Sequence, residues 1–366
     1  MKMNSDRDFG MFITRLIQKE NLSREESRAA FHTILRNETT EMQQGAFLAA
    51  LTAKGETEEE VAGSWEAIYE LDTVKVRTDH PDPLVENSGT GMDTFKTFNI
   101  STAASIVAAS GGVRMARHGA RSITSLCGTV DMAEMLGVDV ECSAELVADS
   151  ISRAGIGLFN GMSPQSHPQA LGRVLSKIYF GSTLNIAASL ANPAMPKIGV
   201  RGVYSREMIL PVIRVMKEIG YERALVFYGG IDHSDRGMDE ASVCGPTFCA
   251  ELKENKEIHE LRFRPEDFGM ETEPPEPLAP SHELDREARD FVSLLRGTKN
   301  GARAKAVALN AGLIFHVTEK GSMVDGVRKA ESILREGSSF STLEKWVQTQ
   351  NRDPQNGSRK LNALCN

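Results

Sequence analysis

The sequence has little cysteine, no long hydrophobic run and no excess of basic residues. Its five cysteines include no Cys-x-x-Cys pair, and Cys244 and Cys249 stand five positions apart around Pro246, a poor spacing for a metal or redox site. No apolar stretch reaches membrane length, and no secretory segment follows Met1. These absences predict a cytoplasmic protein with reduced thiols and no membrane partner.

The charge balance is acidic. A net charge of -8 and a pI near 5.6 provide no overall attraction to nucleic acid or to an anionic membrane. Hydrophobic residues make up 40% of the chain and charged residues 25%, which is typical of a globular enzyme. At 366 residues, the chain suits one large two-lobed unit or two domains.

The first 76 residues predict helices only. Apolar residues recur at helical spacing in four segments, and two of these segments open with capping boxes, Ser23-x-x-Glu26 and Thr57-x-x-Glu60. A proline-containing stretch at residues 78–83 then reads as a linker. We therefore expect a small all-helical lobe at residues 1–76.

Beyond the linker, strand and helix patterns alternate. The predicted strands cover residues 84–87, 113–116, 138–140, 156–159, 198–203, 224–228 and 247–252. The predicted helices cover residues 103–109, 130–136, 144–154, about 169–178, 206–219, 284–295, 303–317 and 323–335. Such alternation predicts an α/β lobe with a central, mainly parallel sheet covered by helices.

A glycine-rich turn follows the first predicted strand. It reads Ser88-Gly89-Thr90-Gly91-Met92-Asp93, and Ser101 or Thr102 is positioned to cap the next helix. A glycine turn that leads to a helix N-terminus suits phosphate, because unpaired N–H groups and the positive end of the helix dipole face the same point. When such glycines occur alone, an ordinary strand–turn–helix is the better explanation. A second loop nearby, with Arg117, His118 and Arg121, favours a phosphate site.

This block resembles the phosphoribosyl pyrophosphate (PRPP) site of the anthranilate phosphoribosyltransferases. That family carries Gly-Thr-Gly-Gly-Asp, Asn-Ile-Ser-Thr, Lys-His-Gly-Asn-Arg and a serine-rich turn that ends Gly-Ser-Ala-Asp. The likeness continues through Asn192-Pro193, Met238-Asp239-Glu240, Gly245-Pro246-Thr247 and residues 265–269.

The resemblance implies a fold of the class IV phosphoribosyltransferase or nucleoside phosphorylase type. A helical lobe of residues 1–76, joined by about 163–192, would face an α/β lobe of residues 80–162 and 193–366 that binds PRPP. The family also implies a homodimer, with contacts made by the helical lobe.

The same resemblance implies site residues and Mg²⁺. The residues that would bind PRPP or a small aromatic acceptor are Gly89, Thr90, Gly91, Asp93, Thr97, Asn99, Ser101, Thr102, Arg117, His118, Gly119, Arg121, Thr124, Ser125, Gly128 and His167. Asp239 and Glu240 match the family's metal-binding pair, and Ser101 would lie near the metal. Hard oxygen ligands of this kind suit Mg²⁺. We assign no catalytic acid or base, because positioning and leaving-group stabilisation should carry the reaction.

Several positions depart from the family pattern. On the donor side, Arg117 replaces a lysine and Met92 replaces a glycine, and a planar guanidinium is not equivalent to an ammonium. On the acceptor side, Ala120 replaces an asparagine, and Ala188-Ser189 stands where the family has Gly-Pro. Leu175 replaces the arginine that grips the anthranilate carboxylate in the family.

The loss of that arginine removes a charge-assisted pair. Such a pair contributes about 1.5–3 kcal/mol, or roughly tenfold to more than a hundredfold in affinity. Arg173 and Lys177 lie one helical face away. They would either substitute for the arginine or serve as solvated helix charges, and both interpretations stay open.

Three functional hypotheses follow. The first is Mg²⁺-dependent transfer of 5-phosphoribosyl from PRPP to the amine of anthranilate or a related aromatic acceptor, as in tryptophan biosynthesis. The second is a noncatalytic protein on the same scaffold that binds nucleic acid or another ligand, against which the acidic balance weighs. The third, a pyrimidine nucleoside phosphorylase, ranks last because the Asn-Ile-Ser-Thr and Asp-Glu elements resemble the transferase pattern.

Overall fold

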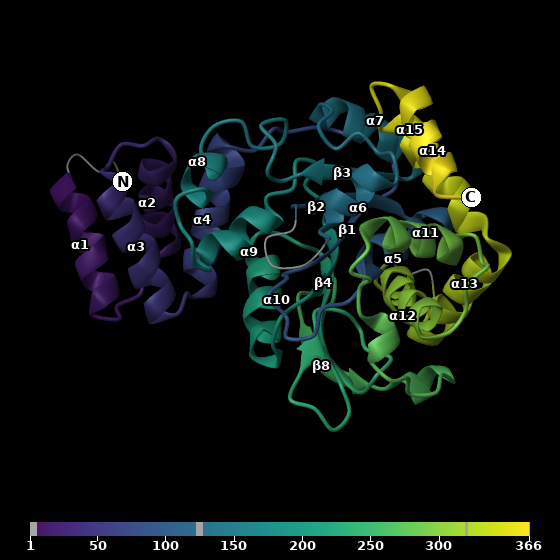
Figure 1. Cartoon of the computed structure of the whole chain (residues 1–366). Coiled ribbons are helices and arrows are strands. Elements are labelled where there is room, and N and C mark those ends of the chain that lie inside the picture. The colour runs from purple at the N-terminus through teal and green to yellow at the C-terminus, as the bar shows by residue number, and fades with distance from the viewer. Residues whose placement is uncertain (1–5, 122–126, 319–320, 366) are drawn as a thin grey trace.

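The computed structural model describes residues 6–121, 127–318 and 321–365. Its first part is a helical lobe, which Figure 1 shows at one end of the molecule in purple. The helices are α1 (Asp6–Ile17), α2 (Arg24–Leu35), α3 (Glu41–Lys54) and α4 (Glu58–Leu71). Both predicted capping boxes form, at Ser23 and Thr57. Phe47 packs between Phe9 and Phe31, with ring centroids 5.3 and 5.7 Å away, so aromatic contacts unite α1, α2 and α3.

A later segment of the chain returns to this lobe. It forms α8 (Leu171–Leu175) and α9 (Thr183–Leu190), of which α8 is shorter than predicted and α9 was not predicted. The indole Nε1 of Trp65 in α4 donates to the carbonyl of Leu190 at 2.9 Å. The buried Asp72 carboxylate, just after α4, accepts the amides of residues 169, 170 and 171 at 2.6, 2.9 and 2.6 Å. These bonds fasten the start of α8 to the end of α4.

The α/β lobe is built on an eight-stranded sheet. The parallel strands, in spatial order, are β3 (Ile156–Asn160), β2 (Arg114–Gly119), β1 (Leu84–Gly89), β4 (Ile198–Gly202) and β5 (Arg223–Gly230). Three antiparallel strands complete the sheet: β7 (Thr247–Leu252), β8 (Ile258–Phe263) and β6 (Gly237–Met238), which pairs with β5. The strand order reverses between β1 and β4, and ligands of open α/β sheets bind at the carboxyl ends of the strands at such a point.

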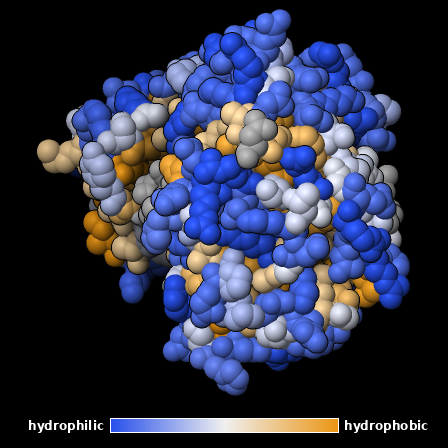
Figure 2. Space-filling view, turned by 45° about the vertical axis from the view of Figure 1, so that its right-hand side comes forward, coloured by the Kyte–Doolittle hydropathy of each residue, from blue (hydrophilic) through white to orange (hydrophobic). Residues whose placement is uncertain are grey.

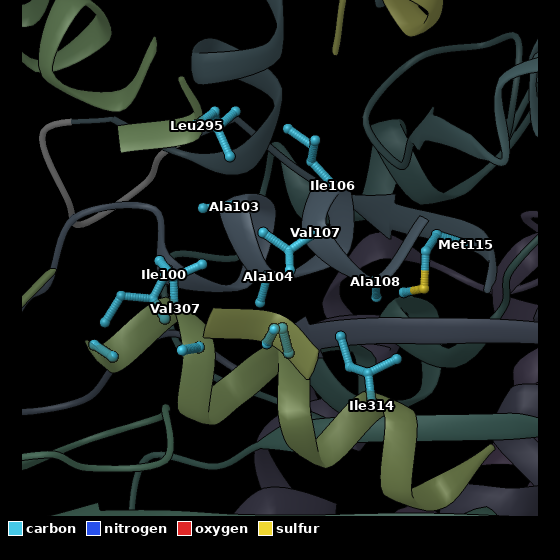
Figure 3. Packing of buried hydrophobic residues seen from close by; sticks show 14 of the residues in the cluster. Ile100, Ala103, Ala104, Ile106, Val107, Ala108, Met115, Leu295, Val307 and Ile314 are labelled. Carbon is cyan, nitrogen blue, oxygen red and sulfur yellow. The ribbon is translucent and has the colours of Figure 1, made fainter. Parts of the chain in front are cut away.

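Helices cover both faces of the sheet. They are α5 (Ile100–Ser110), α6 (Thr129–Met135), α7 (Ala144–Ala154), α10 (Ile209–Glu218), α11 (Leu284–Leu295), α12 (Ala302–Val317), α13 (Met323–Glu336), α14 (Ser338–Thr349) and α15 (Pro354–Ala363). Short 3-10 turns occupy Arg206–Met208, Pro265–Phe268 and Glu276–Leu278. In Figure 3, Ala104 and Ala108 of α5 point toward α12, which carries Val307 and Ile314. This apolar layer fixes α5, whose N-terminus lies beside the glycine loop.

The predicted α/β class with a mainly parallel sheet is confirmed, but some elements differ from the predictions. The strand predicted at residues 138–140 is wrong, because this segment is a loop in which the Asp139 amide donates to the Gln350 carbonyl at 3.0 Å. The edge strand β8 was not predicted, since half of its residues are exposed and its pattern is not apolar. The lobe boundaries assigned from the sequence stay a proposal. Among the described residues, no helix has the length and apolar character needed to cross a membrane.

We predict that Asp72→Ala detaches α8 from α4. The substitution leaves three amides at the start of α8 without their shared acceptor, so the free energy of unfolding should fall by about 3 kcal/mol. Urea denaturation measures this change. Asp82→Asn, at an exposed position, is the matched control and should shift stability by less than about 0.5 kcal/mol. Equal, small effects of the two variants would contradict the assigned role of Asp72.

Candidate active site

Two acidic residues lie against the glycine loop at the carboxyl ends of β1 and β4. The Gly91 amide donates to Asp239 Oδ2 at 2.7 Å, and the Ser101 amide at the start of α5 donates to Glu240 Oε1 at 3.0 Å. Residues about 140 positions apart are therefore joined by two hydrogen bonds to carboxylates. The structure thus brings the acidic doublet together with the first loop.

Glycine is required where the chain approaches this doublet. A Cβ on Gly89 would lie 2.2 Å from Asp239 Oδ2, and one on Gly202 would lie 1.6 Å from the Asp239 carbonyl oxygen. Gly91 and Met92 have φ of +66° and +64°. The left-handed conformation costs a residue such as methionine roughly 1–2 kcal/mol, so the loop holds Met92 in a conformation that glycine would adopt freely.

The doublet is poorly compensated in the absence of a cation. Burial raises the pKa of Glu240 well above its usual range, and the negative charge of the neighbouring Asp239 raises it further. Burial raises the pKa of Asp239 to about 6, and the negative charge of Asp93 is the second cause of this rise. Lys96 is committed to Asp93, with Nζ 2.7 Å from Oδ1. A divalent cation between these carboxylates would relieve the repulsion.

Arg117 is a buried cation behind the first turn of α5. Its guanidinium donates to the Thr102 hydroxyl at 2.6 Å, the Ser101 hydroxyl at 3.1 Å and the Asn87 carbonyl at 3.2 Å. Burial lowers the pKa of Arg117 to about 10, so the side chain stays protonated at neutral pH. The prediction that Ser101 or Thr102 caps the helix is wrong: α5 begins at Ile100 after Asn99, with no side-chain cap, and both hydroxyls instead accept from Arg117.

The remaining residues of the proposed donor set lie nearby in the chain but are not all free. Arg121 Nη1 contacts Asp131 at 3.2 Å and Glu134 at 2.7 Å, so its charge is held against α6. Gly128 is the N-cap of α6, and its amide donates to Asp131 at 2.9 Å. Gly119 ends β2, Thr97 is half-buried before α5, and Asn99 donates to the Cys127 carbonyl at 3.3 Å. Thr124 and Ser125 lie outside the described residues. Donor contacts of this set stay predictions.

His118 and His167 meet where the two lobes join. Their Nε2 atoms are 3.2 Å apart, and the Nδ1 atoms lie 3.2 Å from the Ser189 carbonyl and 2.7 Å from the Asp72 carbonyl. Because carbonyl oxygens only accept, both Nδ1 atoms carry the ring protons and both Nε2 atoms are left as acceptors. Burial lowers the pKa of His118 to about 3 and also lowers the pKa of His167. The neutral pair suits a ligand that donates an N–H group.

The two cations considered as substitutes for an acceptor-binding arginine are used elsewhere. Arg173 donates to Gln44 Oε1 at 2.9 Å and to the Ile34 carbonyl at 2.6 Å, and Lys177 pairs with Glu41. Both therefore bind the N-terminal helices. Leu175 packs beside them against the apolar core of the helical lobe.

Sequence reasoning missed a buried polar group on β4. Arg201 donates to Ser189 Oγ at 2.8 Å, and its Nη1 lies 3.8 Å from Glu86 Oε1. The Tyr221 hydroxyl donates to Glu86 Oε2 at 2.8 Å. A lone arginine inside the otherwise apolar predicted strand at residues 198–203 was the available signal, and it points to a buried ion pair or a ligand.

Comparison with known proteins identifies the family. The family model "Glycosyl transferase family, a/b domain" matches residues 81–340, and "Glycosyl transferase family, helical bundle domain" matches residues 11–71. Anthranilate phosphoribosyltransferases of Persephonella marina and Alkalilimnicola ehrlichii are 33% and 36% identical to this chain. The alignments cover 91% and 89% of this chain and 96% and 94% of those proteins. The chain belongs to the anthranilate phosphoribosyltransferase family.

Solved structures agree with this membership. The anthranilate phosphoribosyltransferase of Thermus thermophilus is 30% identical and superimposes with a TM-score of 0.82 over 93% of this chain and 99% of that one. The Saccharomyces cerevisiae enzyme in complex with PRPP and Mg has a TM-score of 0.81 over 94% and 98% of the two chains. At 21% identity this second likeness supports the fold alone. The predicted family, enzyme class and two-lobed α/β fold are confirmed.

We predict that Gly89→Ala in this family member disturbs the acidic doublet. The added Cβ would overlap Asp239 Oδ2, and such overpacking should lower the free energy of unfolding by about 2 kcal/mol. Gly172→Ala is the control, because a Cβ in that helix meets nothing within 4 Å and alanine favours helix by up to about 1 kcal/mol. Thermal or urea unfolding distinguishes the two. Tolerance of alanine at residue 89 would contradict the close approach.

We also predict a pH-dependent stability that originates at Asp239. Its folded-state pKa of about 6 exceeds the ordinary 3.8, so between these values the folded state binds more protons than the unfolded state. Stability of the metal-free protein must then fall as the pH rises through this window. The full shift corresponds to ~3 kcal/mol, and because Asp239 is partly exposed we expect about 2 kcal/mol.

Asp239→Asn should remove most of that decline and lower the pKa of Glu240, which the Asp239 charge raises. Urea unfolding in a chelating buffer from about pH 4 to about pH 7 measures the effect. Wild-type and variant curves that stay parallel across the window would show that Asp239 titrates normally.

Proposed function

We propose that this protein transfers the 5-phosphoribosyl group of PRPP to the amine of anthranilate or a related aromatic acceptor, with Mg²⁺ and release of pyrophosphate, as tryptophan biosynthesis requires. One observation carries the proposal. Asp239 and Glu240 are held by the amides of Gly91 and Ser101, so a carboxylate pair faces a glycine loop and a helix N-terminus. A divalent cation would bind the carboxylate pair, and anionic phosphates would bind the glycine loop and the helix N-terminus.

The donor diphosphate would lie along the loop and the first turn of α5. Gly89 and Gly91 supply backbone without side chains, and α5 begins after Asn99 without a side-chain cap. Ser101 and Thr102 accept hydrogen bonds from Arg117 and keep their own hydroxyl protons for phosphate oxygens. The buried guanidinium adds a fixed positive charge behind them.

The acidic pair has the chemistry of a Mg²⁺ site. Asp239 and Glu240 offer carboxylate oxygens, and Ser101 lies beside them. Within the ranges that the structure describes, no group of three or more His, Cys, Asp or Glu residues could hold a metal by itself. The remaining positions would therefore be filled by phosphate oxygens and water, as Mg²⁺ prefers. The bound ion would neutralise charge on the departing pyrophosphate.

The acceptor would bind between the lobes. In the transfer step, the amine nitrogen bonds to the ribose C1 while the C1–oxygen bond to pyrophosphate breaks, and the proton that the amine loses passes to the departing pyrophosphate or to water. The Nε2 atoms of His118 and His167 are positioned to accept amine N–H groups. Burial keeps both rings neutral, so they orient an uncharged amine without repelling it.

A homodimer through the helical lobe is part of the proposal. Met11, Ile17 and Met42 on α1 and α3 are 55%, 69% and 85% exposed. Figure 2 shows hydrophobic residues on the side where Figure 1 places this lobe, beside a mostly hydrophilic surface. Exposed apolar side chains on adjacent helices suit a contact between copies. The cytoplasmic location remains a prediction.

A fluorescence assay tests the function. With PRPP, Mg²⁺ and anthranilate, the amine should be substituted and anthranilate fluorescence should fall. One pyrophosphate should accumulate for each anthranilate consumed. Glu240→Gln should slow the reaction more than ~100-fold because the metal site loses a charge. Glu260→Gln, on the exposed edge strand β8, is the matched control and should leave the rate unchanged.

The outcomes separate the hypotheses. Donor binding with persistent fluorescence would exclude anthranilate as acceptor. Failure to bind PRPP would contradict the proposal as a whole, and salt-dependent binding of single-stranded nucleic acid without turnover would favour the noncatalytic alternative.

A further inference from the structure

Arg201 lies on the face of the sheet opposite to the donor residues. In the register of β4 and β1, Arg201 stands opposite Ser88. Asn87, which precedes Ser88 in β1, points to α5 and donates to the Ser101 carbonyl at 3.0 Å. Successive side chains in a strand point to opposite faces. Arg117 reaches α5 on one face, and Arg201 therefore shares the other face with Ser88 and Glu86.

This guanidinium has too few partners. Arg201 is 1% exposed, and within the described part of the chain its Nε and Nη1 atoms have no hydrogen-bond partner. Glu86 is 3.8 Å from Nη1 and already accepts hydrogen bonds from Ser88 and Tyr221. A buried donor without a partner is costly, and a charged one more so. Arg201 is thus a buried cation with unused donors.

Ser189 links this cation to the histidine pair. Its hydroxyl accepts from Arg201 Nη2 at 2.8 Å, and its carbonyl lies 3.2 Å from His118 Nδ1. The same hydroxyl donates to the Ile186 carbonyl at 2.8 Å, and Ser189 is only half-buried. The hydroxyl can therefore release Arg201 and keep a partner, which would open the guanidinium to a ligand bound at His118.

The other cations near the junction of the lobes are occupied. Arg173 and Lys177 bind the N-terminal helices, and Arg117 and Lys96 lie on the donor side. Of the five cations named here, Arg201 is the one with buried donors that lack a hydrogen-bond partner among the described residues. When the Ser189 hydroxyl releases Nη2, the Nη2–H and the unused Nε–H point the same way and match the two oxygens of a carboxylate.

We propose that Arg201 is the specificity-determining residue for a carboxylate on the acceptor. The inference rests on the proposed function and deepens it. An aromatic ring with an amine and a carboxylate on adjacent carbons presents the amine to His118 and His167 and the carboxylate to Arg201. The carboxylate takes the place of the Ser189 hydroxyl, so recognition of the acid and orientation of the amine occur together.

Binding of a matched ligand pair tests this assignment. Anthranilate carries the carboxylate, and 2-aminobenzamide replaces it with a neutral amide of similar shape. Calorimetric titration of wild-type protein, with and without PRPP and Mg²⁺, should show anthranilate binding roughly ten- to a hundredfold tighter. Arg201→Gln should abolish that preference and leave the Kd of 2-aminobenzamide unchanged. Arg201→Lys should keep part of the preference, since a point charge replaces the planar fork.

A double variant separates recognition from folding. Arg201→Gln leaves Glu86 buried without its counter-ion, whereas Arg201→Gln combined with Glu86→Gln removes both charges. The double variant should recover thermal stability but not the preference for anthranilate. Arg201 would be only a counter-ion for Glu86 if the double variant regained the preference, or if Arg201→Gln weakened both ligands equally.

The proposed function and this inference can fail separately. A wild-type protein that binds PRPP but shows no preference for anthranilate overturns the assignment of Arg201, whether or not it turns over. A protein that prefers anthranilate through Arg201 but releases no pyrophosphate supports the assignment and contradicts the proposed transfer.

Discussion

Two hydrogen bonds from backbone amides to adjacent carboxylates organise the candidate site. Gly91 and Ser101 donate to Asp239 and Glu240, and this contact joins the loop after β1, the start of α5 and the segment after β6. Two carboxylates that are close together and largely buried repel each other, which raises their pKa values. The fold tolerates this arrangement because the amides and the apolar layer between α5 and α12 hold the groups in place. In the proposed function, a divalent cation and phosphate oxygens would compensate these charges and amides.

The sheet separates the two halves of the proposed chemistry. Arg117 and its hydroxyl partners lie on the face covered by α5, where phosphate charge would be neutralised. His118 is the next residue of β2 and points to the helical lobe, where it meets His167. Alternation along a single strand thus directs one side chain to the proposed donor site and the next to the proposed acceptor site. The proposed site would use both lobes, since His167 comes from the segment that returns to the helical lobe.

Local signals in the sequence predicted much of this structure. Ser23 and Thr57 formed the expected capping boxes because each needs only its own helix. The glycine loop was recognisable in the sequence because a chain that passes close to another segment needs small residues, here Gly89. The strand at residues 138–140 was wrongly predicted because the alternation Val138-Asp139-Val140 fits a loop bound to Gln350 as well as a strand. Ser101 and Thr102 are not caps because α5 already begins at Ile100, and Arg117, a distant residue, donates to their hydroxyls instead. Tertiary partners of this kind, including those of Arg201, cannot be read from neighbouring residues.

A crystal structure of the chain with PRPP and Mg²⁺ is the most direct test of the central claim. The account predicts the diphosphate between the glycine loop and the first turn of α5, with the metal on Asp239 and Glu240. It also predicts hydroxyl contacts from Ser101 and Thr102, with Arg117 behind them. Donor bound elsewhere, or metal bound without the acidic pair, would contradict the account.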